Sequence, residues 1–577
     1  MPFGERRAGL WLLVVLVTII GIELGARVVE WTRDALVPPP TGETAFAVLA
    51  NPAPAFERAS VDGREVFRRS KAHWIPPRQS FLAEKPADGI RVFSLGGSAA
   101  LGWPHGDGGS YARMLERKLR MLYPGRTVEV INAAGNTYAS YRVRGVFDEI
   151  VAYEPDLILL WTGNNEFFED LAYGMVLPPW PWRHSAVARI LHLASGRAET
   201  EKAVVDVQSY VEADLTASRI GAAFGKRSRL RADPAQYANV VAHYRHNLTT
   251  MAREARRRGI PLVLIDVPVN LKDWQPNASL HHEDLGEDER RRFRAHYRDG
   301  VLAHESGRLL EALAAFDRAL AIDDGHAETH YLRGRVLYGL HRMEEAREAF
   351  VRVLAEDACP FRDVPRFAEI RRRVAARFDL PLVDAPGALS RMAEDGIPGL
   401  DVLVDYVHPT LASNERIAHE VLATLAREGL MPPDRALPLL HTRLDVPRDG
   451  HEHLRVLLKL YPQFLIMRQY DHLGPLAARI QRAIVPAPDD PPERVAALRN
   501  LSERIRRVQR VIAPYRKLLR AEKMGTLEQE FTPERAQRIY HRYARVIQEF
   551  EARDVGESEF QELVPELEYA AVPVPAE

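Results

Sequence analysis

Residues 90–98, IRVFSLGGS, join a short apolar run to two glycines and a serine. The run Ile90–Leu95 is rich in β-branched and aromatic residues, so it predicts a buried strand. Gly96 and Gly97 permit a tight turn at the end of that strand. Ser98 would then present its hydroxyl at the edge of a sheet, close to the start of a helix. Glycine–serine turns also occur in ordinary loops, so this stretch alone does not define a site.

Further apolar runs follow along the chain, and helical sequence such as Tyr111–Leu122 lies between them. The runs are Val128–Asn132, Asp156–Thr162, Ile260–Val267 and Leu380–Val383. Continuous apolar strands that alternate with helices are typical of a parallel sheet covered by helices on both faces. In such sheets the functional sites lie in loops beyond the carboxyl ends of the strands.

Polar residues with complementary chemistry stand near two of these strand ends. Asp405 and His408 are three positions apart, so both side chains fit on one face of a single turn. There a carboxylate can fix the tautomer of the imidazole, while the other ring nitrogen accepts a proton from a serine. Asn165 follows the third predicted strand, where its amide either forms a turn or donates to a developing oxyanion. The order serine, asparagine, aspartate, histidine is more informative than any one of them.

This ordered set resembles the SGNH/GDSL hydrolase family over roughly residues 90–290 and 360–430. The resemblance implies an α/β protein with a flavodoxin-like three-layer α/β/α fold around a parallel sheet. It implies an enzyme that cleaves acyl esters, often O-acetyl groups on carbohydrates, without a metal or cofactor. By the same resemblance Ser98 is the nucleophile, with its own backbone N–H as one oxyanion donor, and Asp405 and His408 complete the catalytic triad.

The remaining oxyanion donors follow the family pattern less closely. Asn165 matches the family's oxyanion asparagine. Gly97 stands where the family has an aspartate, and Glu166 replaces another aspartate, but neither change removes a triad member. We assign the backbone N–H of Gly135 as a further oxyanion donor, with Thr137 as the alternative, because counting along that block reaches Thr137.

A repeat with a period of 34 residues interrupts the α/β region. Six residues recur: Tyr297, Gly300, Glu311, Ala312, Phe316 and Leu320 match Tyr331, Gly334, Glu345, Ala346, Phe350 and Leu354. Small residues where two helices touch, with an aromatic on the second helix, are typical of tetratricopeptide repeats. The insertion resembles a bacterial, repeat-containing subgroup of the SGNH/GDSL family. Two repeats are too few for an independent solenoid, so we expect them to pack on the α/β domain or on flanking helices.

The N-terminus carries Arg6 and Arg7 ahead of an apolar run at about residues 8–26. This run is about the shortest that can span a bilayer. The basic pair favours a cytoplasmic N-terminus with the rest of the chain exported; a cleaved signal peptide is the alternative. We therefore expect a single-pass cell-membrane protein whose catalytic domain lies outside the cytoplasm, in the periplasm if the source is Gram-negative.

These features divide the chain of 577 residues into six segments. They are an N-terminal membrane anchor or signal (1–29), a proline-rich tether and lead-in (30–85), the first part of the hydrolase domain (86–290), two repeats (291–358), the second part of the hydrolase domain (359–430) and a C-terminal helical region (431–577). In the last segment an apolar stripe from Leu498 to Leu519 predicts a helix packed on its own chain. Pro514 lies inside the stripe and should kink or end that helix.

Composition excludes some classes of protein. Lys and Arg number 78 and Asp and Glu number 79, so the net charge of −1 gives no electrostatic case for nucleic-acid binding. The single cysteine, Cys359, excludes an intrachain disulfide and a cysteine-based zinc cluster. We expect Cys359 to be a buried apolar thiol.

Together the sequence predicts an exported, membrane-anchored serine ester hydrolase that forms an acyl-serine intermediate. Its partners would be an ester-bearing substrate, with glycan O-acyl groups as one class, and the membrane. Acyl transfer to a cell-surface glycan is an alternative reaction, since it shares the intermediate. A non-catalytic scaffold whose repeats bind a protein partner is an alternative of another class. We expect Asn270 and Trp274, which follow the fourth predicted strand, to border the pocket. Trp180 and Trp182 either line the pocket or form a packed loop between domains.

Overall fold

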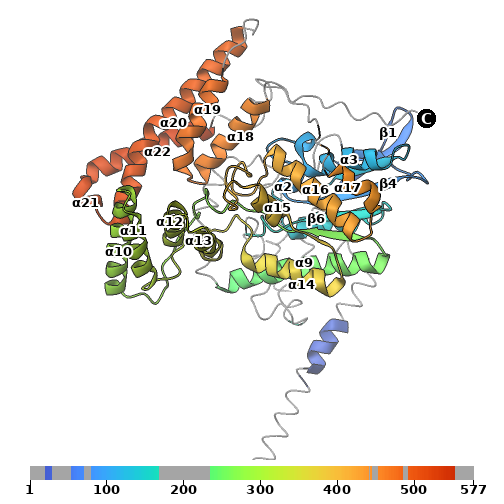
Figure 1. Cartoon of the computed structure of the whole chain (residues 1–577), viewed down its shortest axis with the longest axis horizontal. Coiled ribbons are helices and arrows are strands. Elements are labelled where there is room, and N and C mark those ends of the chain that lie inside the picture. Colours follow the sequence, from blue (N-terminus) through green and yellow to red (C-terminus); the bar gives the residue numbers. More distant parts are fainter. Residues whose placement is uncertain are drawn as a thin grey trace, which may run out of the picture.

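The computed structural model describes residues 18, 20–28, 54–70, 79–167, 187, 234–440, 442, 444, 452–484 and 492–552. An α/β domain lies at one end, and the repeats and the helices after residue 451 lie together at the other (Figure 1). Trp180 and Trp182 lie outside the described residues, so the prediction about them stays a prediction.

A parallel sheet of five strands forms the centre of the α/β domain. The strands are β4 (Ile90–Gly96), β5 (Val128–Asn132), β6 (Leu157–Trp161), β7 (Leu262–Ile265) and β8 (Leu382–Val383). Their order in the sheet is β5-β4-β6-β7-β8, and all neighbouring pairs are parallel. Counted from the first strand this is 2-1-3-4-5, the flavodoxin-like order. The predicted fold class is confirmed, although the last three strands are shorter than expected.

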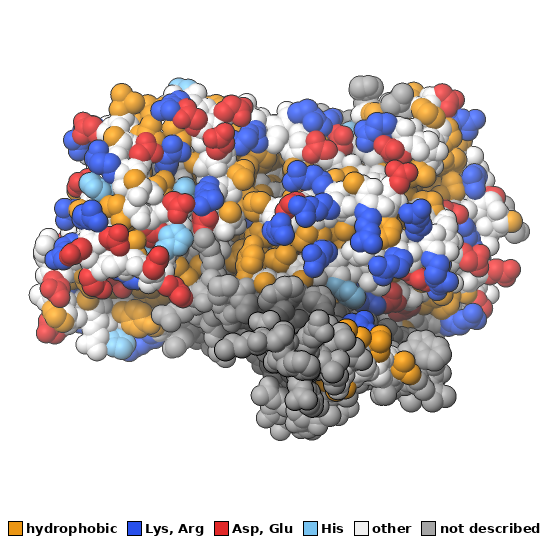
Figure 2. Space-filling view, turned by 90° about the horizontal axis from the view of Figure 1, so that it is seen from below, with side chains coloured by type: hydrophobic (Ala, Val, Ile, Leu, Met, Phe, Trp, Pro, Cys, Tyr) orange, Lys and Arg blue, Asp and Glu red, His pale blue; other side chains and the backbone are white. Residues whose placement is uncertain are grey.

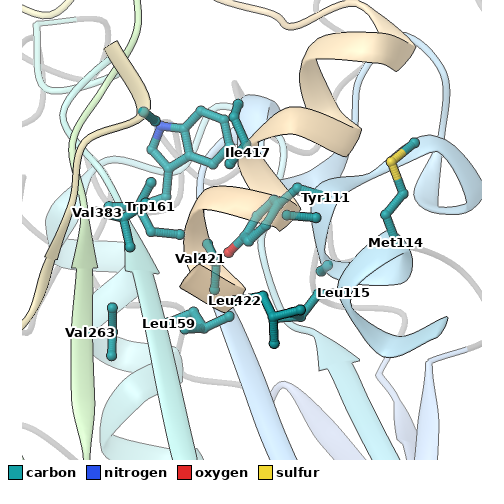
Figure 3. Close-up of a cluster of buried hydrophobic side chains, with 14 of the residues drawn as sticks. Tyr111, Met114, Leu115, Leu159, Trp161, Val263, Val383, Ile417, Val421 and Leu422 are labelled. Atoms are coloured by element: carbon teal, nitrogen blue, oxygen red, sulfur yellow. The ribbon is translucent and has the colours of Figure 1, made fainter. Parts of the chain in front are cut away.

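One face of the sheet is covered by α3 (Tyr111–Leu122), α15 (Ala385–Met392) and α16 (Leu411–Arg427). Their apolar side chains meet those of the strands in a single cluster (Figure 3). Labelled members from the helices are Tyr111, Met114, Leu115, Ile417, Val421 and Leu422, and those from the strands are Leu159, Trp161, Val263 and Val383. A strand buried on both faces needs such continuous apolar sequence, which is why these strands lack a polar–apolar alternation.

The other face is covered by α4 (Ser140–Ile150), α9 (Pro234–Arg258) and α14 (Pro365–Phe378). These helices are amphipathic: their apolar stripes pack on the sheet and their outer surfaces carry exposed arginines such as Arg256 and Arg372. Figure 2 shows Lys and Arg side chains on the half of the underside that carries α9 and α14. The domain therefore has three layers, as expected.

A small antiparallel sheet precedes the domain, where the sequence predicted only a tether and lead-in. It consists of β1 (Phe56–Val61), β2 (Arg64–Arg69) and β3 (Ser80–Leu82). Asp62 and Gly63 connect the first two strands with φ angles of 50° and 75°. Asp-Gly in that conformation is the usual two-residue hairpin turn. The segment predicted as a tether and lead-in, 30–85, thus contains three strands that the sequence analysis did not predict.

The inserted repeats form two helical pairs, α10 (Glu287–Glu305) with α11 (Leu309–Leu320) and α12 (Ala327–Gly339) with α13 (Met343–Glu356). Gly300 and Gly334 lie against the rings of Phe316 and Phe350, where an added Cβ would come within 2.5 and 2.7 Å of a ring carbon. These contacts explain why a small residue and an aromatic recur together. Both pairs share one hydrophobic cluster with Leu271, which belongs to the α/β domain.

The C-terminal region is helical, as predicted. Its helices are α17 (Pro433–Leu439), α18 (Glu452–Ile466), α19 (Tyr470–Ala483), α20 (Pro492–Met524), α21 (Leu527–Glu530) and α22 (Pro533–Ala552). The apolar stripe of α20 is buried on α18 and α19, together with Cys359, so it packs on its own chain. Pro514 lies inside α20, which runs on for ten residues to Met524. The expectation that this proline could end the helix is therefore wrong.

Residues 20–28 of the predicted N-terminal anchor are helical (blue in Figure 1). Residues 1–17, which hold much of the predicted span, are outside the described part of the chain. Among the helices that are described, none combines the length and the apolar character needed to cross a bilayer.

Candidate active site

Ser98 stands where the sequence places it, at the carboxyl end of β4. It is the first residue of the short helix α2 (Ser98–Leu101), and it follows Gly97. A Cβ at Gly97 would lie 2.4 Å from Nδ2 of Asn165, so an aspartate could not occupy this position without displacing that amide.

Asp405 and His408 lie in a tight turn whose flanks are joined. The backbone N–H of Val404 donates to the His408 carbonyl at 2.8 Å, and Leu403 forms a β-bridge with Pro409. Oδ1 of Asp405 accepts two backbone N–H groups, from Val407 and His408, each at 2.9 Å. The turn thus fixes the carboxylate and the imidazole relative to each other.

The three predicted triad residues converge into one hydrogen-bonded line. Oδ2 of Asp405 lies 2.6 Å from Nδ1 of His408, and Nε2 of His408 lies 2.8 Å from Oγ of Ser98. An ionised carboxylate can only accept, so Nδ1 carries the hydrogen and Nε2 is free to accept from the serine hydroxyl. Ser98 and His408 are separated by 310 positions in the sequence. This arrangement can activate a serine as a nucleophile.

The line is buried among aromatic rings. Asp405 has no exposed surface, and His408 and Ser98 are 3% and 8% exposed. The Trp103 ring lies 4.4 Å from the His408 ring between centroids, and the Tyr406 ring lies 5.6 Å from it. Burial, and then the negative charge of Asp405, raise the pKa of Tyr406, so this phenol stays neutral. Trp103 was not singled out in the sequence, because a tryptophan five positions after the serine carries no motif.

Asn165 faces the same turn as Ser98. Its Nδ2 donates to the Tyr138 carbonyl at 3.1 Å, which leaves the second hydrogen of the amide for another acceptor. The neighbouring Glu166 is fully buried and accepts from the backbone N–H and the hydroxyl of Ser140 at 2.8 and 2.7 Å. Glu166 therefore caps the first turn of α4 with a negative charge, a stabilising position, and anchors the strand end that carries Asn165.

Gly135 and Thr137 differ in how their backbone N–H groups are used. The N–H of Gly135 donates to the Gly96 carbonyl at 3.1 Å, so that donor is committed to the backbone. An added Cβ at Gly135 would lie 2.4 Å from the Tyr138 ring, which gives this glycine a packing role. Thr137 has a φ of 58°, and its N–H has no acceptor among the described residues. Which N–H completes the oxyanion site stays a prediction.

Asn270 and Trp274 were expected to border the pocket, and both are fully buried beside the acid turn. Asn270 Nδ2 donates to the Asp405 carbonyl at 3.0 Å, and the Trp274 ring packs 5.3 Å from that of Tyr406. A single sequence holds no signal for this contact, since 135 positions separate Asn270 from Asp405.

The histidine pair His281 and His282 lies at the repeats, away from this line. The two rings pair with Asp323 and Asp324 at 2.6 and 3.0 Å. Among the described residues, no group of three or more His, Cys, Asp or Glu side chains is arranged to hold a metal ion.

Comparison with known proteins supports the repeats and names similar folds. The tetratricopeptide repeat family matches residues 303–360, which confirms the predicted insertion. No curated protein matches the chain.

Solved structures similar to this chain are GDSL-type hydrolases. A lipolytic protein of the G-D-S-L family from Desulfitobacterium hafniense is 10% identical, with 58% of this chain and 99% of that chain covered and a TM-score of 0.26. The acetylxylan esterase Axe2 from Geobacillus stearothermophilus is 10% identical, with coverages of 60% and 96% and a TM-score of 0.29. The lipase/acylhydrolase from Enterococcus faecalis is 12% identical, with coverages of 60% and 98% and a TM-score of 0.27.

Proposed function

We propose that this protein is a serine ester hydrolase that acts through an acyl-serine intermediate. The observation that carries the proposal is the line Asp405–His408–Ser98, with hydrogen-bond distances of 2.6 and 2.8 Å. Ser98 and the Asp405–His408 turn come from separate parts of the chain and meet beyond the carboxyl ends of the strands, where sheets of this order place their sites.

In the proposed reaction Oγ of Ser98 attacks the ester carbonyl while Nε2 of His408 takes the hydroxyl proton. His408 then returns that proton to the alcohol oxygen as the carbon–oxygen bond breaks. Water attacks the acyl-serine by the same route, which releases the acid and restores Ser98. Asp405 keeps the imidazole in the required tautomer and stabilises its charged form throughout.

The negative charge on the carbonyl oxygen would be stabilised by the Ser98 N–H and the remaining Nδ2 hydrogen of Asn165. For a third donor we now favour the N–H of Thr137 over that of Gly135, because Gly135 already donates to Gly96. Each such donor is worth about 100-fold to 1,000-fold in rate.

As substrates we propose short acyl esters, with O-acyl groups on carbohydrates as the class to test first. This part rests on the sequence resemblance to the SGNH/GDSL family. We also propose that the protein is exported and membrane-anchored through the apolar run at about residues 8–26. Extraction of the full-length protein from membranes by detergent but not by alkaline carbonate is the expected result, and release by carbonate would count against an anchor.

The test is labelling with a fluorophosphonate probe, followed by mass spectrometry to find the modified residue. We expect label on Ser98, no label in Ser98→Ala, and at least a ~10⁴-fold loss of p-nitrophenyl acetate hydrolysis in that variant. Ser94→Ala is the matched control, since Ser94 lies on the same strand and its hydroxyl bonds to the buried Tyr111 in the core. Label elsewhere, or unchanged hydrolysis in Ser98→Ala, would exclude the mechanism. Incubation of an acetylated sugar with and without a second sugar then distinguishes hydrolysis from transfer.

A further inference from the structure

Asn270 is bonded to the two peptide groups that carry the acid of the triad. Its Nδ2 donates to the Asp405 carbonyl at 3.0 Å, and its backbone N–H donates to the Tyr406 carbonyl at 2.9 Å. Its Oδ1 accepts from the backbone N–H of Asp273 at 2.9 Å, which fixes the amide's orientation. The side chain is fully buried, so water does not compete for these bonds.

The Asp405 carboxylate itself depends on where its backbone lies. Its hydrogen bonds come from Val407, His408 and the His408 ring, all within its own turn. Because no other described residue bonds to this carboxylate, its aim at His408 is set by the position of the turn as a whole. Side chains of Ser413 and Asn414 bond to the flanks of the turn, and Asn270 bonds to the Asp405 carbonyl itself.

The loop that contains Asn270 is in turn held by the inserted repeats. The Tyr331 hydroxyl of α12 donates to the Lys272 carbonyl at 3.2 Å. Arg362, which follows the second repeat, donates from Nη1 to the carbonyls of Asn270 and Trp274 at 2.8 and 3.0 Å. Arg362 is 2% exposed and lies 3.8 Å from the buried Asp357 carboxylate. The loop is therefore bonded both by the second repeat, through Tyr331, and by the segment that follows it, through Arg362.

The repeats contact a second part of the same chain. Lys523 of α20 pairs with Glu328 of α12, and Arg520 of α20 pairs with Glu305 of α10, each at 2.6 Å. The first helix of each repeat thus faces α20 or the Asn270 loop. These intramolecular contacts give the insertion a role within the site that needs no separate protein partner.

We propose that Asn270 is a positioning residue for Asp405, and that its loop is held in place by Tyr331 of the second tetratricopeptide repeat and by Arg362, which follows that repeat. This inference rests on the proposed ester hydrolysis. It assigns the insertion to the catalytic geometry of its own chain, in place of a scaffold that recruits other proteins.

The first experiment measures p-nitrophenyl acetate hydrolysis by the full-length Asn270→Asp variant, which keeps the size of the side chain and loses its donor. We expect kcat to fall about 10-fold to 100-fold with KM nearly unchanged, because the acid shifts while the substrate pocket does not. The same substitution in an Asp405→Ala background should cost nothing further, since Asn270 would act only through Asp405. If Asn270→Asp lowered kcat by the same factor in the Asp405→Ala background as in the wild type, the proposal would be overturned. An unchanged kcat in the single variant would also overturn it.

A second experiment tests whether the repeats hold the loop, and it uses two Tyr→Phe variants in place of changes at Asn270. Tyr297 and Tyr331 hold the same position in the two repeats, but the Tyr297 hydroxyl bonds to Glu328 and not to the loop. Tyr331→Phe should lower kcat about 3-fold, an effect of one lost neutral hydrogen bond, and Tyr297→Phe should leave it unchanged. Equal effects of the two would overturn the role of the repeats. If Ser98→Ala retains hydrolysis, the proposed function fails before this question arises.

Discussion

The two sides of the candidate site are held in different ways. On the nucleophile side, Ser98, Asn165 and their supports Gly97 and Glu166 lie within residues 96–166 and contact one another across adjacent strand ends. On the acid side, Asp405 and His408 occupy a turn that is bonded by Asn270. The loop that contains Asn270 is bonded in turn by Tyr331 of the second repeat and by Arg362, which follows it. The first side is built into the sheet edge, whereas the second is assembled from segments far apart in the sequence. Loops that evolve by insertion can therefore alter the acid side without disturbing the nucleophile.

Among substitutions that leave the triad itself intact, the largest effect is expected from crowding the nucleophile side. In Gly97→Ala the new Cβ would meet Nδ2 of Asn165 at 2.4 Å, so the amide must move away from the oxyanion position. We expect kcat/KM to fall about 100-fold to 1,000-fold, as for loss of one oxyanion donor. Hydrolysis of p-nitrophenyl acetate measures it.

The control for this substitution is Gly286→Ala, at a helix start where the nearest atom to an added Cβ is 3.6 Å away. It should leave activity unchanged. The double variant Gly97→Ala/Asn165→Ala should be no worse than Asn165→Ala alone, because both changes remove the same donor. Full activity in Gly97→Ala would mean that Asn165 does not need its present position.

The nucleophile side and the acid side also differ in how far their residues could be predicted from the sequence. The sequence could identify the reactive residues because their positions are local features. Ser98 and Asn165 each follow a predicted strand, and Asp405 and His408 share one turn, so spacing along the chain is enough to find them. The hairpin between β1 and β2 is an equally local feature, because the dipeptide Asp62-Gly63 is typical of a two-residue hairpin turn. The sequence analysis did not predict it.

The supports of the acid side could not be found in this way. Asn270 and Asp405 meet only after β7 and the acid turn have folded together, and no spacing encodes that contact. The commitment of the Gly135 N–H to Gly96 is likewise a tertiary hydrogen bond, invisible to counting along a block. Burial of the α20 stripe on α18 and α19 overrides the tendency of Pro514 to end a helix.

A smaller, pH-dependent effect is expected in the repeats that brace the acid side. Nδ1 of His326 accepts from the Thr329 N–H at the start of α12, and burial lowers the pKa of His326 from 6.5 to about 4. Unfolded chains take up a proton below pH 6.5, whereas the folded His326 does not until about pH 4. Folding stability is thus full above pH 6.5 and falls as the pH drops towards 4, by about 1–2 kcal/mol for this half-buried group.

His326→Asn keeps a side-chain acceptor at the helix start and removes the titration. Urea midpoints followed by circular dichroism at pH 7 and pH 4.5 should therefore differ less in the variant than in the wild type. His341→Asn, at an exposed position in the same repeat, should keep the wild-type difference. If the pH dependence of stability were unchanged in His326→Asn, other titratable groups would be its source.

The smallest effect is expected at the outermost support of the acid side, the ion pair between Lys523 and Glu328. Burial alone would raise the pKa of Glu328, but the ammonium of Lys523, 2.6 Å away, holds that pKa below its usual value. Lys523 is half exposed, so its pairing contributes little to stability. Lys523→Met should lower the free energy of unfolding by about 0.5–1 kcal/mol, with kcat/KM unchanged because Tyr331 and Arg362 still hold the loop. Lys517→Met, at an exposed position on the same helix, is the control. If kcat/KM fell in Lys523→Met and not in Lys517→Met, the position of Asp405 and His408 would depend on α20 as well. The acid side would then be supported by the C-terminal helices in addition to the repeats.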